Sequence, residues 1–92
     1  MDLGLEGKAF VMTGAARGLG HATAQALVSE GADVLISGRT EASLREAQQR
    51  LGASSAFLVT DNSDPEAGEN LTSECIKRFG RIDGALISVG GP

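Results

Sequence analysis

Short apolar runs alternate with longer segments of helical pattern along the whole of this 92-residue chain. Runs of this length suit buried strands, and the segments between them repeat apolar residues at helical spacing. The expected strands are Lys8–Thr13, Asp33–Ser37, Ala56–Thr60 and Gly84–Ser88; the expected helices are Gly18–Glu30, Thr40 to Gly52 and Ser63 to Gly80. This β-α-β-α-β-α-β order predicts a parallel α/β sheet with right-handed crossovers and helices on both faces.

The helical segments indicate which residues face the core. The expected core faces are Leu19, Ala22, Ala26 and Leu27 in the first helix, Leu44, Ala47 and Leu51 in the second, and Leu71, Cys75 and Phe79 in the third. Ser63, followed by Pro65 and Glu66, predicts a capped start of the third helix. We expect a single partial domain over 1–92, whose fourth strand is an apolar edge open to self-association or to a partner.

The segment Thr13-Gly14-Ala15-Ala16-Arg17-Gly18-Leu19-Gly20 links the first expected strand to the first expected helix. The first N–H groups of a helix have no partner within the helix and carry the positive end of its dipole. A pyrophosphate can accept hydrogen bonds from them where no Cβ blocks its approach, and glycine meets that condition. The sequence therefore predicts a dinucleotide-binding, Rossmann-type doubly wound fold with strand order 3-2-1-4.

The spacing of these glycines is G-x-x-x-G-x-G after a threonine, rather than the commoner G-x-G-x-x-G. This form resembles the short-chain dehydrogenase/reductase family, whose first strand ends in T-G-x-x-x-G-x-G. The resemblance continues through Ser37-Gly38-Arg39, through Asp61-Asn62, and to Ser88-Val89-Gly90-Gly91, where the family usually shows N-N-A-G. It implies the amino-terminal, cofactor-binding portion of an oxidoreductase acting on a carbonyl or alcohol, truncated after the fourth strand.

Charge at the end of the second strand predicts which cofactor is preferred. A site specific for NAD places an acidic side chain on the adenosine ribose at this point, about 20 residues past the loop. Here Gly38 holds that place, and Arg39 follows it. Glycine leaves room for a 2′-phosphate and arginine supplies a fork of donors, with Arg17 able to reach the same phosphate from the loop. We therefore expect NADP, with NAD less favoured.

The resemblance implies further cofactor contacts. The Asp61 position hydrogen-bonds the adenine amino group in the family, with Asn62 beside it, and Ser63 is expected to cap the helix and leave Asp61 free. Gly90 permits close approach to a ribose, although valine at position 89 departs from the family asparagine. The full set of expected cofactor residues is Gly14, Arg17, Gly18, Leu19, Gly20, Ser37, Arg39, Asp61, Asn62 and Gly90.

Other features exclude several functions. The net charge of −4 and the lack of a basic patch argue against nucleic acid. No apolar stretch is long enough for a bilayer, and Asp2 and Glu6 are atypical of a signal peptide, so we expect a cytoplasmic protein. His21 lacks partners at metal spacing and is expected to be an exposed helix residue, and Cys75 a core residue.

The chain contains no tyrosine. The family resemblance implies a catalytic Tyr-x-x-x-Lys pair and a serine beyond the fourth strand, so we expect this chain alone to be inactive. Three interpretations remain open: the cofactor-binding part of a reductase, a free-standing nucleotide-binding or assembly module without catalysis, and an unrelated doubly wound binder, for instance of S-adenosylmethionine. The positions of Arg39 and Asp61 suit a dinucleotide better than the last of these.

Overall fold

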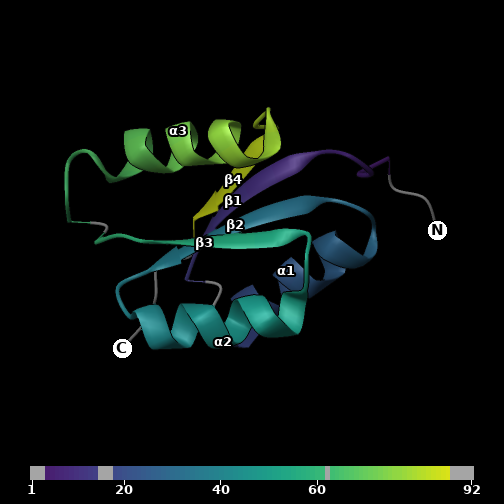
Figure 1. Ribbon diagram of the computed structural model, residues 1–92, viewed down its shortest axis with the longest axis horizontal. Helices are drawn as coiled ribbons and strands as arrows, with labels where there is room; N and C mark the ends of the chain where they lie inside the picture. The colour runs from purple at the N-terminus through teal and green to yellow at the C-terminus, as the bar shows by residue number, and fades with distance from the viewer. Residues whose placement is uncertain (1–3, 15–17, 62, 88–92) are drawn as a thin grey trace.

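The computed structural model describes residues 4–14, 18–61 and 63–87. In these residues one four-stranded parallel sheet lies between helices (Figure 1). The elements are β1 (Ala9–Thr13), α1 (Gly18–Ser29), β2 (Asp33–Gly38), α2 (Glu41–Leu51), β3 (Ser55–Val59), α3 (Ala67–Phe79) and β4 (Gly84–Ile87). The strand order is β3-β2-β1-β4, which confirms the predicted doubly wound arrangement.

The register of the sheet brings the carboxyl ends of the strands to one edge. Thr13 is the partner of Ser37 in β2 and of Ile87 in β4, and Gly38 is the partner of Val59 in β3. Helices α1 and α2 cover one face of the sheet, and α3 covers the other (Figure 1). Because the chain changes face after β3, the winding reverses between β1 and β4, where doubly wound sheets hold their ligands.

Each face of the sheet has its own apolar core. The core under α1 and α2 comprises Met12, Ala24, Val34, Ile36, Leu44, Ala47 and Leu51, and the core under α3 comprises Ala9, Val11, Leu35, Ala56, Leu71 and Cys75. Alternate residues of one strand therefore enter opposite cores, as the period of two requires. The predicted faces of α2 and α3 are confirmed, and so is the buried position of Cys75. Burial, the largest cause, raises the pKa of the Cys75 thiol.

Helix α1 presents a different face from the predicted one. Leu19 is 85% exposed, whereas His21 is only 8% exposed and Ala24 is fully buried. The prediction of an exposed His21 was therefore wrong, as was the inward placement of Leu19, Ala22 and Ala26. The helix is rich in alanine and glycine, whose small side chains give a weak apolar stripe, so the pattern could not define which way the helix turns.

Helix α3 begins later than predicted, with Glu66 at its N-cap instead of Ser63. Two aspartates reorganise the preceding turn: Asp61 Oδ1 accepts from Ser63 N, and Asp64 Oδ1 accepts from Glu66 N, both at 2.9 Å. Aspartate side chains that accept backbone N–H groups in this way compete with helix formation.

Within the described part of the chain, no helix is long and apolar enough to cross a membrane.

Asp83 joins the start of β4 to the start of β1. Its carboxylate accepts from Ala9 N at 2.8 Å and from both Nε and a terminal nitrogen of Arg81 at 2.7 Å. The backbone continues the link, since Asp83 N donates to Ala9 O at 2.8 Å. The Arg81 hydrogen bonds first, and the Ala9 N–H second, lower the pKa of Asp83 to about 2.

This lowered pKa predicts a specific acid sensitivity. The folded-state pKa lies below the usual 3.8, so the stabilisation is present above about pH 4 and is lost as the pH falls toward 2. We expect Asp83→Asn to lower the urea midpoint at pH 7 and to flatten its decline between pH 5 and pH 2.5. The control is Glu41→Gln, which breaks an exposed pair with Arg45 and should change little. Parallel declines in Asp83→Asn and the original protein would contradict this role.

Candidate dinucleotide-binding site

A cleft of about 990 Å³ opens at the carboxyl ends of the strands. One part is polar and includes Thr13, Gly14, Arg39 and Asp61. Another part is apolar and lies against α3 and β4, with Val11, Leu71, Ile82, Ala85 and Leu86 in its lining. A cleft with one polar end and one apolar wall can hold an elongated ligand whose charged groups lie at the strand ends.

Two glycines of the loop, Gly14 and Gly18, have the left-handed backbone that glycine adopts without strain. Gly14 has φ 73° and donates its N–H to Ser37 O at 3.1 Å, which joins the loop to the end of β2. Gly18 has φ 69°, and a Cβ built there would meet no atom of the described residues within 4 Å. The space beside Gly18 at the start of α1 is therefore open, and a side chain at this position would occupy it. Gly20 lies in the first turn of α1, where Leu19 projects into solvent.

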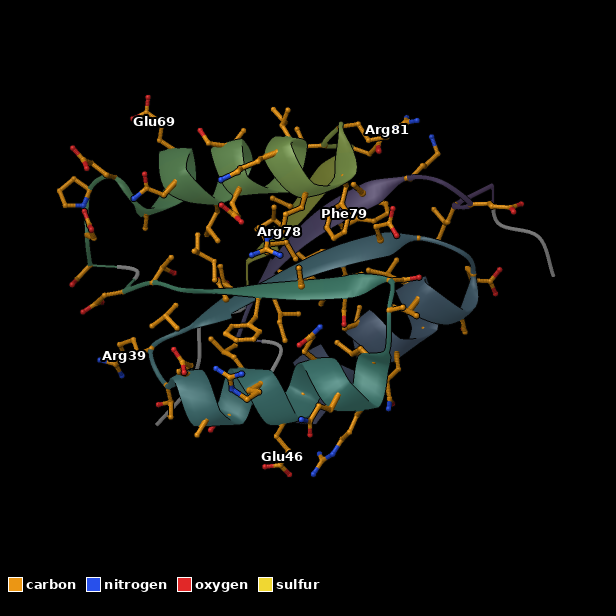
Figure 2. The ribbon with its side chains drawn as sticks, viewed as in Figure 1. Arg39, Glu46, Glu69, Arg78, Phe79 and Arg81 are labelled. Carbon is orange, nitrogen blue, oxygen red and sulfur yellow. The ribbon has the colours of Figure 1, made fainter. Side chains whose placement is uncertain are left out.

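The end of β2 carries the predicted phosphate-recognising residue. Gly38 leads out of the strand, and Arg39 follows it with an exposed side chain. Figure 2 shows Arg39 at the end of the molecule opposite Arg81, beside the start of α2. Thr60 N donates to Gly38 O at 2.8 Å, which holds the segment after β3 against the end of β2. Arg39 and Asp61 consequently line the same cleft.

Asp61 is not free in the way the sequence predicted. Its Oδ1 accepts from both the backbone N and the hydroxyl of Ser63, each at 2.9 Å. These two hydrogen bonds, the backbone one first, lower the pKa of Asp61, and the charge of Arg39 adds a smaller effect in the same direction. The carboxylate is therefore an anion that is already positioned at the cleft, with Arg39 as its nearby countercharge.

Two buried hydroxyls, those of Ser37 and Thr60, belong to residues that line the cleft. Ser37 is 1% exposed, and neither its Oγ nor the Oγ1 of Thr60 has a hydrogen-bond partner among the described residues. Ser37 is one of the site residues that the sequence predicts, whereas the sequence predicts Thr60 only as the end of a strand. Alternate residues of a strand face the same side of a sheet, so Thr60 lies on the α3 side with Ala56 and Leu58. This alternation is the sequence signal that could have identified Thr60. Together the two hydroxyls make the floor of the cleft polar.

Some predicted contacts lie outside the described residues. Arg17, Asn62 and Gly90 belong to this group, so their contribution stays a prediction from the sequence. Gly14, Ser37, Arg39 and Asp61 line one cleft at the carboxyl ends of the strands, whereas Gly18, Leu19 and Gly20 lie at the start of α1, outside that lining. Among the described residues, histidine, cysteine, aspartate and glutamate side chains form no group of three that could hold a metal ion.

A parallel sheet wound in this order, with glycines at its reversal point, has the arrangement of the Rossmann-type α/β fold, the class of fold that typically binds dinucleotides. The chain matches the short chain dehydrogenase family over residues 8–91 and belongs to that family. It is 36% identical over 90 residues to an uncharacterized oxidoreductase of Mycobacterium tuberculosis, a match that covers 95% of this chain and 34% of the relative.

Solved structures of related proteins share the fold of this chain. A short chain dehydrogenase from Bacillus anthracis superposes with a TM-score of 0.87 and 27% identity, over 95% of this chain and 36% of the other. A 3-ketoacyl-(acyl-carrier-protein) reductase from Brucella melitensis, solved in complex with NADH, gives 0.82 and 27%, over 88% and 34%. The chain therefore spans about a third of the length of these relatives.

Proposed function

We propose that this chain is the NADP(H)-binding portion of a short-chain dehydrogenase/reductase-type oxidoreductase that acts on a carbonyl or alcohol substrate. The observation that carries the proposal is Arg39, an exposed cation at the cleft, directly after the Gly38 position where an NAD-specific site needs a carboxylate. Membership of the family supports a nicotinamide dinucleotide as ligand but not the choice between its two forms. The Brucella relative was solved with NADH, so family membership does not argue for NADP(H). The argument for NADP(H) over NAD(H) therefore rests on the local charge of Arg39.

Different residues would bind different parts of the cofactor. The loop glycines Gly14, Gly18 and Gly20 would hold the pyrophosphate, with Arg17 and Leu19 beside it. Arg39 would hold the 2′-phosphate, with Ser37 beneath the adenosine ribose. Asp61 would accept from the adenine amino group, with Asn62 beside it and Gly90 near the second ribose. When bound, the cofactor supplies hydride transfer; this chain contains no tyrosine to act as the family's proton donor.

The size of the expected preference follows from one interaction. A hydrogen bond to a charged group is worth about 1.5–3 kcal/mol, which corresponds to roughly 10- to 100-fold in affinity. Arg39 is exposed, so solvent screens its charge and the lower end of that range applies. We expect NADPH to bind at least about tenfold more tightly than NADH, and Arg39→Ala to remove most of the difference.

Isothermal titration of the chain with NADPH and NADH tests the proposal. Arg50→Ala is the matched control, because Arg50 pairs with Glu46 on α2 and does not line the cleft. Arg50→Ala removes one positive charge, as Arg39→Ala does, and should keep the preference for NADPH over NADH. Equal affinities, absent binding, or an Arg39→Ala variant that still discriminates would contradict an NADP site.

A non-catalytic nucleotide-binding or assembly module is the second candidate. It is favoured by β4, which among the described residues pairs with β1 alone and carries a Leu86 side chain that is 43% exposed. Edge strands of this kind offer unpaired backbone groups to another chain. Light scattering of the titrated samples examines this candidate: concentration-dependent association supports it, and a monomer at high concentration contradicts it.

A further inference from the structure

We propose that Ser63 is a positioning residue of the adenine site, which holds the Asp61 carboxylate by one oxygen and leaves the other to accept from the adenine amino group. This inference rests on the proposed function, since it requires an adenine nucleotide at the cleft. It concerns a residue that does not itself contact the ligand. Ser63 acts through Asp61 alone.

The geometry separates the two oxygens of the carboxylate. Oδ1 accepts two hydrogen bonds from Ser63, one from the backbone N and one from the side-chain Oγ, both at 2.9 Å. Within the described residues, no hydrogen bond reaches Oδ2. An ionised carboxylate is a pure acceptor with room for several donors, whereas the adenine amino group is a donor. The second oxygen is thus chemically matched to the group that distinguishes adenine from other purines.

The surrounding turn holds Ser63 in place without help from its hydroxyl. Asp64 N donates to Asp61 O at 2.9 Å, and Ala67 N donates to Asp64 O at 3.0 Å. Asp64 Oδ1 also accepts from Glu66 N at 2.9 Å. None of these hydrogen bonds involves the Ser63 side chain. The turn between Asp61 and α3 should therefore keep its conformation when that side chain is removed.

The Ser63 hydroxyl does not cap α3. The N-cap is Glu66, which makes no side-chain capping bond, so the contact seen for the Ser63 hydroxyl is the one with Asp61. Asp61 is exposed, and an exposed carboxylate without restraint would sample several rotamers. A ligand would then have to order the carboxylate as it binds, which lowers affinity. The second hydrogen bond removes that freedom in advance.

The experiment compares adenosine 2′,5′-bisphosphate with its purine analogue that lacks the 6-amino group, by titration calorimetry on the 92-residue chain. We expect Ser63→Ala to weaken the adenine compound about three- to tenfold, the range for one hydrogen bond, and to leave the analogue within about twofold. Ser63→Thr keeps a hydroxyl and should restore affinity. Ser73→Ala, at an exposed serine on α3, is the matched control and should change neither.

A second readout needs no ligand. The carboxyl carbon of Asp61, followed by NMR during an acid titration, should show a higher pKa in Ser63→Ala than in the original chain, because a bond to the charged form is lost. An unchanged pKa overturns the inference. An equal loss of affinity for both purine compounds overturns it as well, while leaving the proposed dinucleotide site intact. Failure of the original chain to bind either compound, or NADPH, overturns the proposed function and this inference together.

Discussion

Gly18→Val is expected to weaken dinucleotide binding by at least about 100-fold. Gly18 has φ 69° at the first residue of α1, in the left-handed region that a β-branched side chain adopts only under strain. The new side chain would also occupy space that is open in the described structure and that we assign to the pyrophosphate. Both effects act on the helix start, where backbone N–H groups must face the phosphates. Titration with NADPH measures the loss.

The matched control for Gly18 is Gly80→Val. Gly80 has φ 80°, ends α3, and likewise has no described atom within 4 Å of a built Cβ. Each substitution should lower the free energy of unfolding by about 1–2 kcal/mol through backbone strain. Only the substitution at Gly18 should weaken dinucleotide binding, because Gly80 precedes the amino end of β4, away from the cleft. Comparable NADPH affinities in the two variants would show that the loop is not a phosphate cradle.

Leu35→Ala is expected to lower the free energy of unfolding by about 2–5 kcal/mol, the range for a leucine truncated in a packed core. Leu35 is fully buried at the centre of β2, a strand paired on both sides by β1 and β3. Small domains of this size have little stability to spare, so the loss is a large share of the total. The chain has no tryptophan or tyrosine, so urea unfolding is best followed by far-ultraviolet circular dichroism.

Leu19→Ala is the same substitution at an 85% exposed side chain. It should change stability by less than about 0.5 kcal/mol, as surface substitutions usually do. A loss at Leu19 as large as that at Leu35 would mean that α1 packs on the sheet differently from the arrangement described above.

The fold could be predicted because the strong signals in the sequence are local. The run Val34, Leu35 and Ile36 is apolar on both faces, which suits only a strand buried between helices. Leu44, Ala47 and Leu51 repeat at helical spacing, and Gly52 ends the helix with φ 94°. Alternating strands and helices then leave few topologies, because parallel crossovers are right-handed. The strand order was predicted correctly on this basis, and the family was predicted correctly from the spacing of the glycines at 14, 18 and 20 and from the motifs at the strand ends.

The details of the site could not be predicted in the same way. Alanine-rich α1 has several faces of similar polarity, and only its packing on the sheet decides that His21 and Ala24 turn inward. The sequence predicts separate roles for the two residues, ligand binding for Asp61 and helix capping for Ser63, because a sequence does not show which donor meets which acceptor. In the structure Ser63 is hydrogen-bonded to Asp61, and helix α3 begins at Ala67.

The sequence by itself determined the class of fold, the glycine loop and the chemical type of the residue after β2. These depend on periodicity, on the absence of a Cβ and on charge, which are properties of residues close together in the chain. The tertiary structure alone decided which hydroxyls lie buried beneath the cleft, which oxygen of Asp61 stays available and how Asp83 fastens β4 to β1. The buried hydroxyls and the Asp83 contacts depend on segments far apart in the chain, whose geometry forms only when the sheet assembles. The Asp61 contact lies within one turn, but a sequence does not show which donor of that turn meets which carboxylate oxygen.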